Sequence, residues 1–368
     1  MKSGVFSARK TSIYLFYLNK YSIFVTFETL ISLRLFVLKP TFVKIVNPLL
    51  VAKLSLITLL MSNIAMAQDP TFTQFYANPS YLNPALAGSS GCPRVSLNYR
   101  NEWPQLTGNY VTYAAAYDTY AKNISGGFGL LAMHDMQGQG TIQTSMIGGI
   151  YSYNLKVTRK FSIMFGARAA YFQKFLDWDK LTFGDMIDPR RGFIYQTGDV
   201  PRGNGRRGFF DVSFGTVGFT KNFYAGFAVH HLNRPDESMI LGESRLPMRF
   251  TGHIGSNIKL GQRGRYSSTT FLSPNIIYQY QNGFQELNIG AYLKYENFTI
   301  GAWYRNRDAF IMTVGINTDK FKIGYSYDLT VSKLGNGVSG GSHEVSMGIN
   351  LKCKKKPKNF RKTSCPSF

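Results

Sequence analysis

The chain has 368 residues, a formal net charge of +22 and a hydrophobic content of 44%. Beyond residue 67 no uninterrupted apolar run is long enough for a transmembrane helix, which excludes a helical membrane bundle. Aromatic residues make up 15% of the chain, and 36 residues are glycine. This composition is typical of a membrane β-barrel with aromatic girdles and tight turns, and a soluble all-β protein is the alternative.

The N-terminal region predicts an export signal. Lys53 precedes an apolar stretch at residues 54–60, and an Ala-x-Ala cleavage sequence ends at Ala67. Gln68 follows, rather than the cysteine of a lipoprotein. Residues 1–50 are rich in Phe and Leu and are far longer than the usual charged start of a signal peptide. We therefore expect an over-extended gene start in this stretch, with a genuine long leader as the alternative.

The next segment, residues 68–92, predicts a short arm without strands. It contains Asn78-Pro79 and Asn83-Pro84, followed by Gly88 and Gly91. Proline and glycine at this density break regular structure. The sequence allows this arm to lie either in the periplasm or inside a barrel lumen.

Strand-like segments then follow at regular spacing, and they alternate apolar and polar residues. Each is about nine to fifteen residues long, which is enough to cross a bilayer at a tilt. Their even number fits an antiparallel transmembrane barrel whose two ends lie on the same side. The fourteen predicted strands are 93–101, 109–119, 124–134, 141–155, 160–174, 208–218, 222–231, 247–260, 270–280, 286–295, 297–305, 309–317, 320–328 and 342–352.

The alternation is clearest in the last third of the chain. Phe321, Ile323 and Tyr325, for example, are separated by Lys322 and other small or polar residues. Such a polar face cannot form the core of a sandwich, but it can line the wet interior of a barrel whose apolar face meets lipid. We expect five of these polar residues to point inward and to hydrogen-bond a guest segment. They are Glu286, Asn288, Lys294, Glu344 and Asn350.

The connections between the predicted strands sort by length. The long ones, residues 174–207, 232–246 and 330–341, all fall on one side of the predicted barrel. Those on the other side are short, apart from residues 261–269. Short periplasmic turns with long external loops are the outer-membrane pattern, so both termini are expected in the periplasm.

The longest external loop, residues 174–207, is rich in charges of both signs. We expect its acids to pair with its arginines and to order it as an external lid, because loops of this length in a barrel are usually functional. Calcium binding is the alternative, although the spacing matches no known calcium loop. The acids are Asp177, Asp179, Asp185, Asp188 and Asp199. The arginines are Arg190, Arg191, Arg202, Arg206 and Arg207.

Motifs for catalysis, metal binding or a cofactor are not found in the sequence. There is no nucleophile elbow, phosphate loop or dinucleotide fingerprint. His230 and His231 are consecutive, so on a strand they would point to opposite faces, a poor arrangement for shared metal ligation. His253 and Ser256 differ by three positions, which also places them on opposite faces. We predict no enzyme activity, no cofactor and no metal.

The chain ends in a basic tail, residues 353–368, next to the barrel at residues 93–352. The tail's charge favours contact with anionic lipid head groups or an acidic partner over nucleic acid, and a merely solvated tail is the alternative. The three cysteines, Cys92, Cys353 and Cys365, fit no zinc motif. An oxidising compartment allows one disulfide, either Cys353–Cys365 or Cys92–Cys365, and the sequence does not choose between them.

Several ordered motifs resemble the PorP/SprF family of outer-membrane proteins. The start of the mature chain carries Phe75 and Tyr76, then Asn83-Pro84-Ala85 and Gly88. Further similar segments lie at residues 99–104, 181–190, 211–215, 342–346 and 365–368. The likeness spans residues 68–368, nearly all of the expected mature chain, whereas residues 1–50 depart from the family pattern.

The resemblance implies a non-enzymatic role in type IX secretion and gliding motility. Members of the family serve the export or surface anchoring of large adhesins with a C-terminal sorting domain, beside periplasmic ring or lipoprotein components. We expect Arg190, Arg191, Arg206 and Arg207, with Asp185 and Asp188, to hold the sorting domain. The arm and the tail are expected to contact the periplasmic partner. A solute channel of the outer membrane is the alternative function.

Overall fold

The computed structural model describes residues 69–198, 204–239, 242–260, 270–332 and 335–352. These residues fall into two compact units, and each is considered by itself. The smaller unit contains residues 182–198, and the larger one contains the other described residues. Within the described ranges, no helix is long and apolar enough to cross a membrane.

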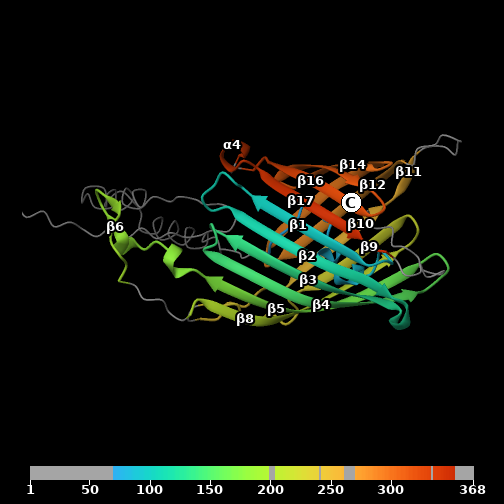
Figure 1. Cartoon of the computed structure of the whole chain (residues 1–368), viewed down its shortest axis with the longest axis horizontal. Coiled ribbons are helices and arrows are strands. Elements are labelled where there is room, and N and C mark those ends of the chain that lie inside the picture. Colours follow the sequence, from blue (N-terminus) through green and yellow to red (C-terminus); the bar gives the residue numbers. More distant parts are fainter. Residues whose placement is uncertain (1–68, 199–203, 240–241, 261–269, 333–334, 353–368) are drawn as a thin grey trace, which may run out of the picture. The chain divides into compact units, whose positions relative to one another are not determined.

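The larger unit is a closed antiparallel β-barrel of fourteen strands (Figure 1). β10 and β11 are two parts of one strand, because both pair with β12 and only Asn257 separates them. β1 pairs with β17 from Arg94–Asn350 to Glu102–Ser342, and this pairing closes the ring. The strands are β1 (Arg94–Glu102), β2 (Tyr110–Ala121), β3 (Gly126–Gln137), β4 (Ile142–Lys156), β5 (Ser162–Leu176), β8 (Arg206–Phe219), β9 (Phe223–His230), β10 (Arg249–Ser256), β11 (Ile258–Leu260), β12 (Thr270–Gln281), β13 (Phe284–Tyr295), β14 (Phe298–Arg305), β15 (Ala309–Asn317), β16 (Phe321–Thr330) and β17 (Ser342–Asn350).

The predicted all-β transmembrane barrel and its fourteen strands are confirmed, and the strand ends agree to within about three residues. Alternation along each strand sorts the side chains as expected. Ile147, Phe210 and Met312 point outward and are 60%, 71% and 69% exposed. Inward positions such as Asn288 and Ser326 are fully buried. An apolar outer surface of this kind is what lipid requires.

Tight turns and short helices connect the strands. Asn282 and Gly283 form a two-residue turn between β12 and β13, and both have positive φ, at 45° and 86°, as the favoured hairpin turn demands. The short helices of the larger unit outside the lumen are η2 (Lys122–Ile124), η3 (Trp178–Lys180) and α4 (Asn336–Ser339).

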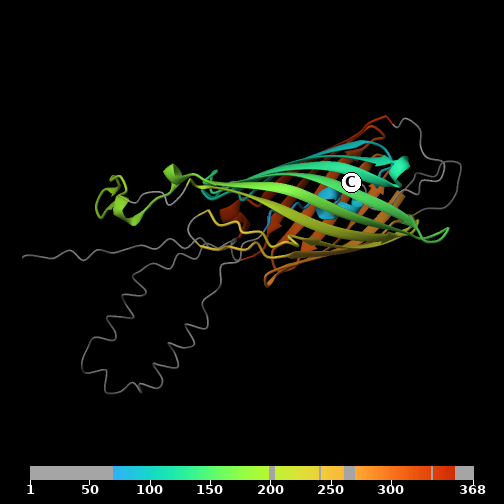
Figure 2. The same ribbon diagram turned by 90° about the horizontal axis from the view of Figure 1, so that it is seen from below.

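The interior of the barrel is occupied by the chain's own residues 69–92, here called the luminal segment (Figures 1 and 2). It contains α3 (Pro79–Leu82) and η1 (Pro84–Leu86), each with a proline in its first turn, where the missing N–H costs nothing. Apolar side chains of the segment and of the wall form a common core. The wet interior expected from the sequence is therefore wrong for this part of the lumen, because Trp303, Tyr292 and Ile277 point inward and bury their surface against the segment.

The smaller unit is a short hairpin. η4 (Gly184–Met186) leads into β6 (Ile187–Asp188), which pairs antiparallel with β7 (Gly192–Phe193). Gly192 has a positive φ of 76°, which a residue with a side chain adopts only rarely.

Candidate functional site

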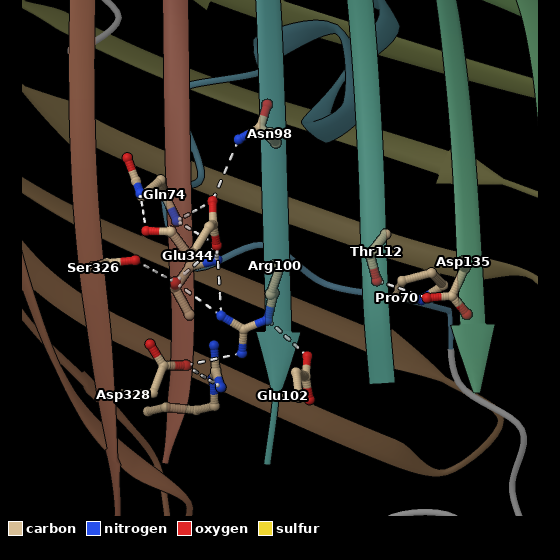
Figure 3. A network of polar contacts seen from close by, with 12 residues as sticks. Pro70, Gln74, Asn98, Arg100, Glu102, Thr112, Asp135, Ser326, Asp328 and Glu344 are labelled. Carbon is tan, nitrogen blue, oxygen red and sulfur yellow. Dashed lines mark hydrogen bonds and ion pairs between the residues drawn. The ribbon is translucent and has the colours of Figure 1, made fainter. Parts of the chain in front are cut away.

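The first half of the luminal segment is held by a buried carboxylate on β17. Glu344 is fully buried, and its Oε2 accepts hydrogen bonds from the backbone N–H of Thr73 at 2.6 Å and from the Thr73 hydroxyl at 2.9 Å. The backbone N–H of Gln74 donates to Glu344 Oε1 at 3.3 Å, and the Gln74 amide donates to the Glu344 backbone oxygen at 3.0 Å. Figure 3 shows Glu344 at the centre of these contacts.

Two buried arginines extend this network around the wall. Arg100 of β1 binds Asp328 at 2.9 Å and Glu102 at 2.7 Å, and it also donates to the Thr73 hydroxyl at 3.0 Å. Arg305 of β14 lies 3.4 Å from Asp328. Its Nε contacts Asn288 at 3.2 Å and Glu286 at 3.5 Å. We call this set the acidic network, because its buried members are two arginines and three carboxylates: Arg100, Arg305, Glu286, Asp328 and Glu344.

Three of the five inward polar residues predicted from the sequence belong to this network. Glu344 binds the luminal segment directly, whereas Glu286 and Asn288 contact Arg305 of the wall. The structure does not bring the other two to the network. Asn350 donates to the backbone oxygen of Asp319 in the turn before β16, and Lys294 is only half-buried on β13.

A second set of charges holds the start of the luminal segment, and we call it the basic chain. Arg168 contacts Asp211 at 3.4 Å, and Asp211 contacts His231 Nδ1 at 2.8 Å. His231 Nε2 lies 2.7 Å from Asp69, which in turn lies 3.3 Å from Arg249. Charges of opposite sign thus alternate along this row of side chains, which begins with Arg168 and ends with Arg249.

His231 carries a proton on both ring nitrogens in this arrangement. Each nitrogen faces a carboxylate oxygen, and a carboxylate can only accept, so both nitrogens donate and the ring is an imidazolium. The expectation that His230 and His231 point to opposite faces is wrong. β9 ends at His230, His231 has a positive φ of 59°, and both side chains are buried.

The acidic network and the basic chain lie on opposite walls of the barrel. Glu344 is on β17, and His231 directly follows β9. In the ring of strands six others separate β17 from β9 in either direction: β1, β2, β3, β4, β5 and β8 on one side, and β16, β15, β14, β13, β12 and β10 on the other. The luminal segment connects the two walls, since it offers Asp69 to the basic chain and backbone N–H groups to Glu344.

The second half of the luminal segment is held by hydrogen bonds and close packing. Asn83 donates through Nδ2 to the backbone oxygens of Thr216 and Phe227, each at 3.2 Å, while its Oδ1 accepts from the N–H of Ala85. A Cβ added at Gly166 would lie 2.3 Å from the Ala85 nitrogen. The wall therefore needs glycine where the Asn83–Gly88 turn approaches it.

All six residues of the N-terminal motif lie in the lumen. Phe75 packs on Trp303 with ring centroids 4.9 Å apart, and Tyr76 packs on Tyr224 at 5.9 Å. Gly88 donates its N–H to Asp118 at 2.8 Å and has a φ of 71°. The remaining motif residues, Asn83, Pro84 and Ala85, form the start of η1.

Within the described residues, the ion pairing predicted for the loop of residues 174–207 is not found. Asp188 accepts from the backbone N–H groups of Arg190 and Arg191, at 2.8 and 2.9 Å, and these bonds lower the pKa of its carboxyl group. Asp185 accepts in the same way from Gly198 and from the Thr197 hydroxyl. Among the ion pairs of the described residues, none joins an acid of this loop to one of its arginines. Short Asp side chains find nearby backbone donors more readily than distant guanidinium groups.

The arginines expected to act together have different surroundings. Arg190 and Arg191 are exposed on the hairpin of the smaller unit. Arg207 instead forms an ion pair with Asp236 at 2.5 Å, and Arg206 lies over the Phe175 ring at 5.2 Å. Asp199 and Arg202 lie outside the described residues.

Cys92 is disulfide-bonded. Cys353 and Cys365, and the basic tail that contains them, lie outside the described residues.

A family model described as type IX secretion system membrane protein PorP/SprF matches residues 64–349. A search of curated proteins finds no significant match. Among solved structures, an outer membrane protein of Acinetobacter baumannii covers 71% of this chain and is itself covered completely, at 8% identity and a TM-score of 0.38. A FadL homologue from Pseudomonas aeruginosa covers 75% of this chain, with 94% of its own length, at 12% identity and a TM-score of 0.39.

Proposed function

Because the chain belongs to the PorP/SprF family of type IX secretion system membrane proteins, we propose that it supports the export or surface anchoring of large adhesins. In this role it is a non-enzymatic outer-membrane component, and it binds the C-terminal sorting domain of its client. Its other partners are periplasmic ring or lipoprotein components of the same machinery. The observation that carries the proposal is the luminal segment, whose apolar side chains share a buried core with the barrel wall and so favour a binding component over an open pore.

The same observation counts against a solute channel. Phe75, Leu82 and Leu86 of the segment share a buried core with the inward side chains of the wall. A channel needs an open path or a ladder of polar sites along it, and these contacts fill that path with apolar groups. The channel therefore remains the second candidate, favoured only if the segment leaves the lumen.

We place the client contact on the exposed hairpin of the smaller unit. Arg190 and Arg191 project from it, and the carboxylate of Asp188 is engaged by their backbone N–H groups rather than by their guanidinium groups. The guanidinium groups thus keep their capacity for a carboxylate-bearing partner, for which arginine is well suited. We give Arg206 and Arg207 a different role, because they contact Phe175 and Asp236 of this chain.

The proposal is tested by charge reversal in living cells. The variant Arg190→Glu/Arg191→Glu should release one very large protein from the cell surface into the medium, as measured by quantitative proteomics of both fractions. The matched control is Arg159→Glu/Lys160→Glu, two exposed cations in the β4–β5 turn, which should leave the surface proteome unchanged.

Deletion of the whole gene should remove the same client from the surface. If deletion leaves the surface proteome intact, the secretion role is wrong. If deletion removes the client but charge reversal does not, the role stands and the placement of the contact on this hairpin is wrong.

A further inference from the structure

A small cavity lies between the luminal segment and the barrel wall. The space open to the centre of a water-sized sphere is about 20 Å³, so a water molecule or a monatomic ion fits there. The wall contributes Arg249 and Thr251 of β10 and Gln279 of β12, and the segment contributes Asn78 and Tyr81 among others.

Asn78 faces this cavity in an unusual way. It stands at the N-cap of α3, where an asparagine side chain normally accepts a hydrogen bond from the first turn of the helix. Here its side chain makes no such bond, is 3% exposed, and has no hydrogen-bond partner among the described residues for either amide atom. A buried amide without partners costs free energy, so its position points to a ligand in the cavity.

Arg249 supplies a second donor to the same cavity. Its side chain is buried, and its Nε has no hydrogen-bond acceptor within the described part of the chain. Asp69 lies near the other side of the guanidinium, 3.3 Å from Nη1. The Nε–H of Arg249 and the Nδ2–H of Asn78 are therefore two donors that line one small space.

The charge of the basic chain decides what kind of ligand fits. Arg168, His231 and Arg249 are three cations, and Asp211 and Asp69 are two carboxylates. One positive charge is left over in a buried place, and an uncompensated buried charge is strongly unfavourable. A water molecule would satisfy the donors but would leave that charge in place. An anion would satisfy the donors and neutralise the charge.

We propose that this cavity binds a chloride-sized inorganic anion, which joins Arg249 of the wall to Asn78 of the luminal segment and completes the basic chain. The anion is a structural ligand, and this inference goes beyond the proposed role in secretion. It makes the seating of the luminal segment depend on halide concentration.

The first test measures thermal unfolding of the purified full-length barrel in detergent. At constant ionic strength, replacing methanesulfonate with chloride should raise the midpoint saturably, by about 2–4 °C for a ligand worth ~1 kcal/mol. If the midpoint of thermal unfolding were the same in chloride and in methanesulfonate, the proposal would be wrong and water would be the occupant.

Two asparagine variants separate the site from general salt effects. Asn78→Asp places a carboxylate where the anion would lie, so its midpoint should no longer respond to chloride. The control is Asn98→Asp, which adds a negative charge beside Glu344. This variant should be less stable but should keep the full chloride response. An unchanged chloride response in Asn78→Asp would show that chloride acts elsewhere.

A direct readout does not depend on any variant. Crystals grown in sodium bromide should give an anomalous peak between Asn78 and Arg249. Bromide peaks only at the protein surface would contradict the proposal.

Discussion

Glu344 is a fully buried carboxylate whose burial is compensated mainly by the luminal segment and Arg100. Thr73 offers two donors, Gln74 a third, and the Arg100 guanidinium lies 3.5 Å away. Hydrogen bonds to an ionised group are shorter and stronger than neutral ones, and here they connect residues 271 positions apart in the sequence. Removing the carboxylate would leave the Thr73 and Gln74 backbone donors without their acceptor, whereas Arg100 would keep Asp328 and Glu102.

We therefore expect Glu344→Ala to destabilise the folded barrel by about 3 kcal/mol or more, since it leaves the buried backbone N–H groups of Thr73 and Gln74 without their acceptor. Glu344→Gln keeps the shape and one acceptor, so it should cost less. Urea unfolding in detergent measures both. Glu243→Gln, at a residue whose side chain is 77% exposed, is the control and should be neutral. A neutral Glu344→Ala would contradict the assigned role.

At the scale of elements, the Asn83–Gly88 turn and the wall fit each other only through glycine. A Cβ at Gly166 would overlap the Pro84–Ala85 backbone, at 2.3 to 2.5 Å, and backbone atoms there cannot move aside cheaply. Gly149 of the neighbouring strand β4 faces outward and has open space around its Cβ position. Gly149 is therefore a suitable control position for a substitution at Gly166.

Gly166→Val should leave the barrel strands formed but prevent the turn from seating, with a cost of about 2 kcal/mol or more from overpacking. Limited proteolysis should then cleave within residues 69–88, while the parent protein and Gly149→Val resist. Protection of the segment in Gly166→Val would show that the wall can adapt.

The strands could be predicted from the sequence because their signal is local. Alternation between, for example, Phe321, Lys322 and Ile323 is imposed by lipid on one side and protein on the other. The luminal site could not be predicted in the same way. Asp69, Thr73 and His231 are polar residues in unremarkable surroundings, and only tertiary contacts bring them to their partners. His231 misled the prediction because the strand ended one residue earlier than expected and the backbone turned.

Partial success at Glu286, Asn288 and Glu344 has a physical reason. A carboxylate or amide on the inward face of a barrel must find partners, so inward polarity alone indicates a binding surface. Which partner it finds is a separate matter: Glu344 binds the luminal segment, whereas Glu286 and Asn288 bind Arg305 of the wall. Arg100, Arg249 and Arg305 carried the same signal, as inward-facing charges on predicted strands, and could have been included on that basis.

At the scale of the whole molecule, the barrel is a fourteen-stranded wall closed around its own N-terminal segment. The purified protein should therefore show no steady ion conductance in planar bilayers. Deleting residues 69–76 removes the contacts to Glu344 and to the basic chain, and this variant should conduct. A parent protein that conducts as well as the deletion variant would favour the channel over the secretion role.

The binding site for Thr73 lies on the seam of the barrel. Glu344 of β17 and Arg100 of β1 are directly paired across the junction of the last and first strands, and both contact the Thr73 hydroxyl. A chain whose final strand has not yet joined the first therefore has no complete site for this residue. Ring closure and docking of the segment are coupled steps of assembly, and a late folding intermediate would have both an unpaired edge and an undocked arm.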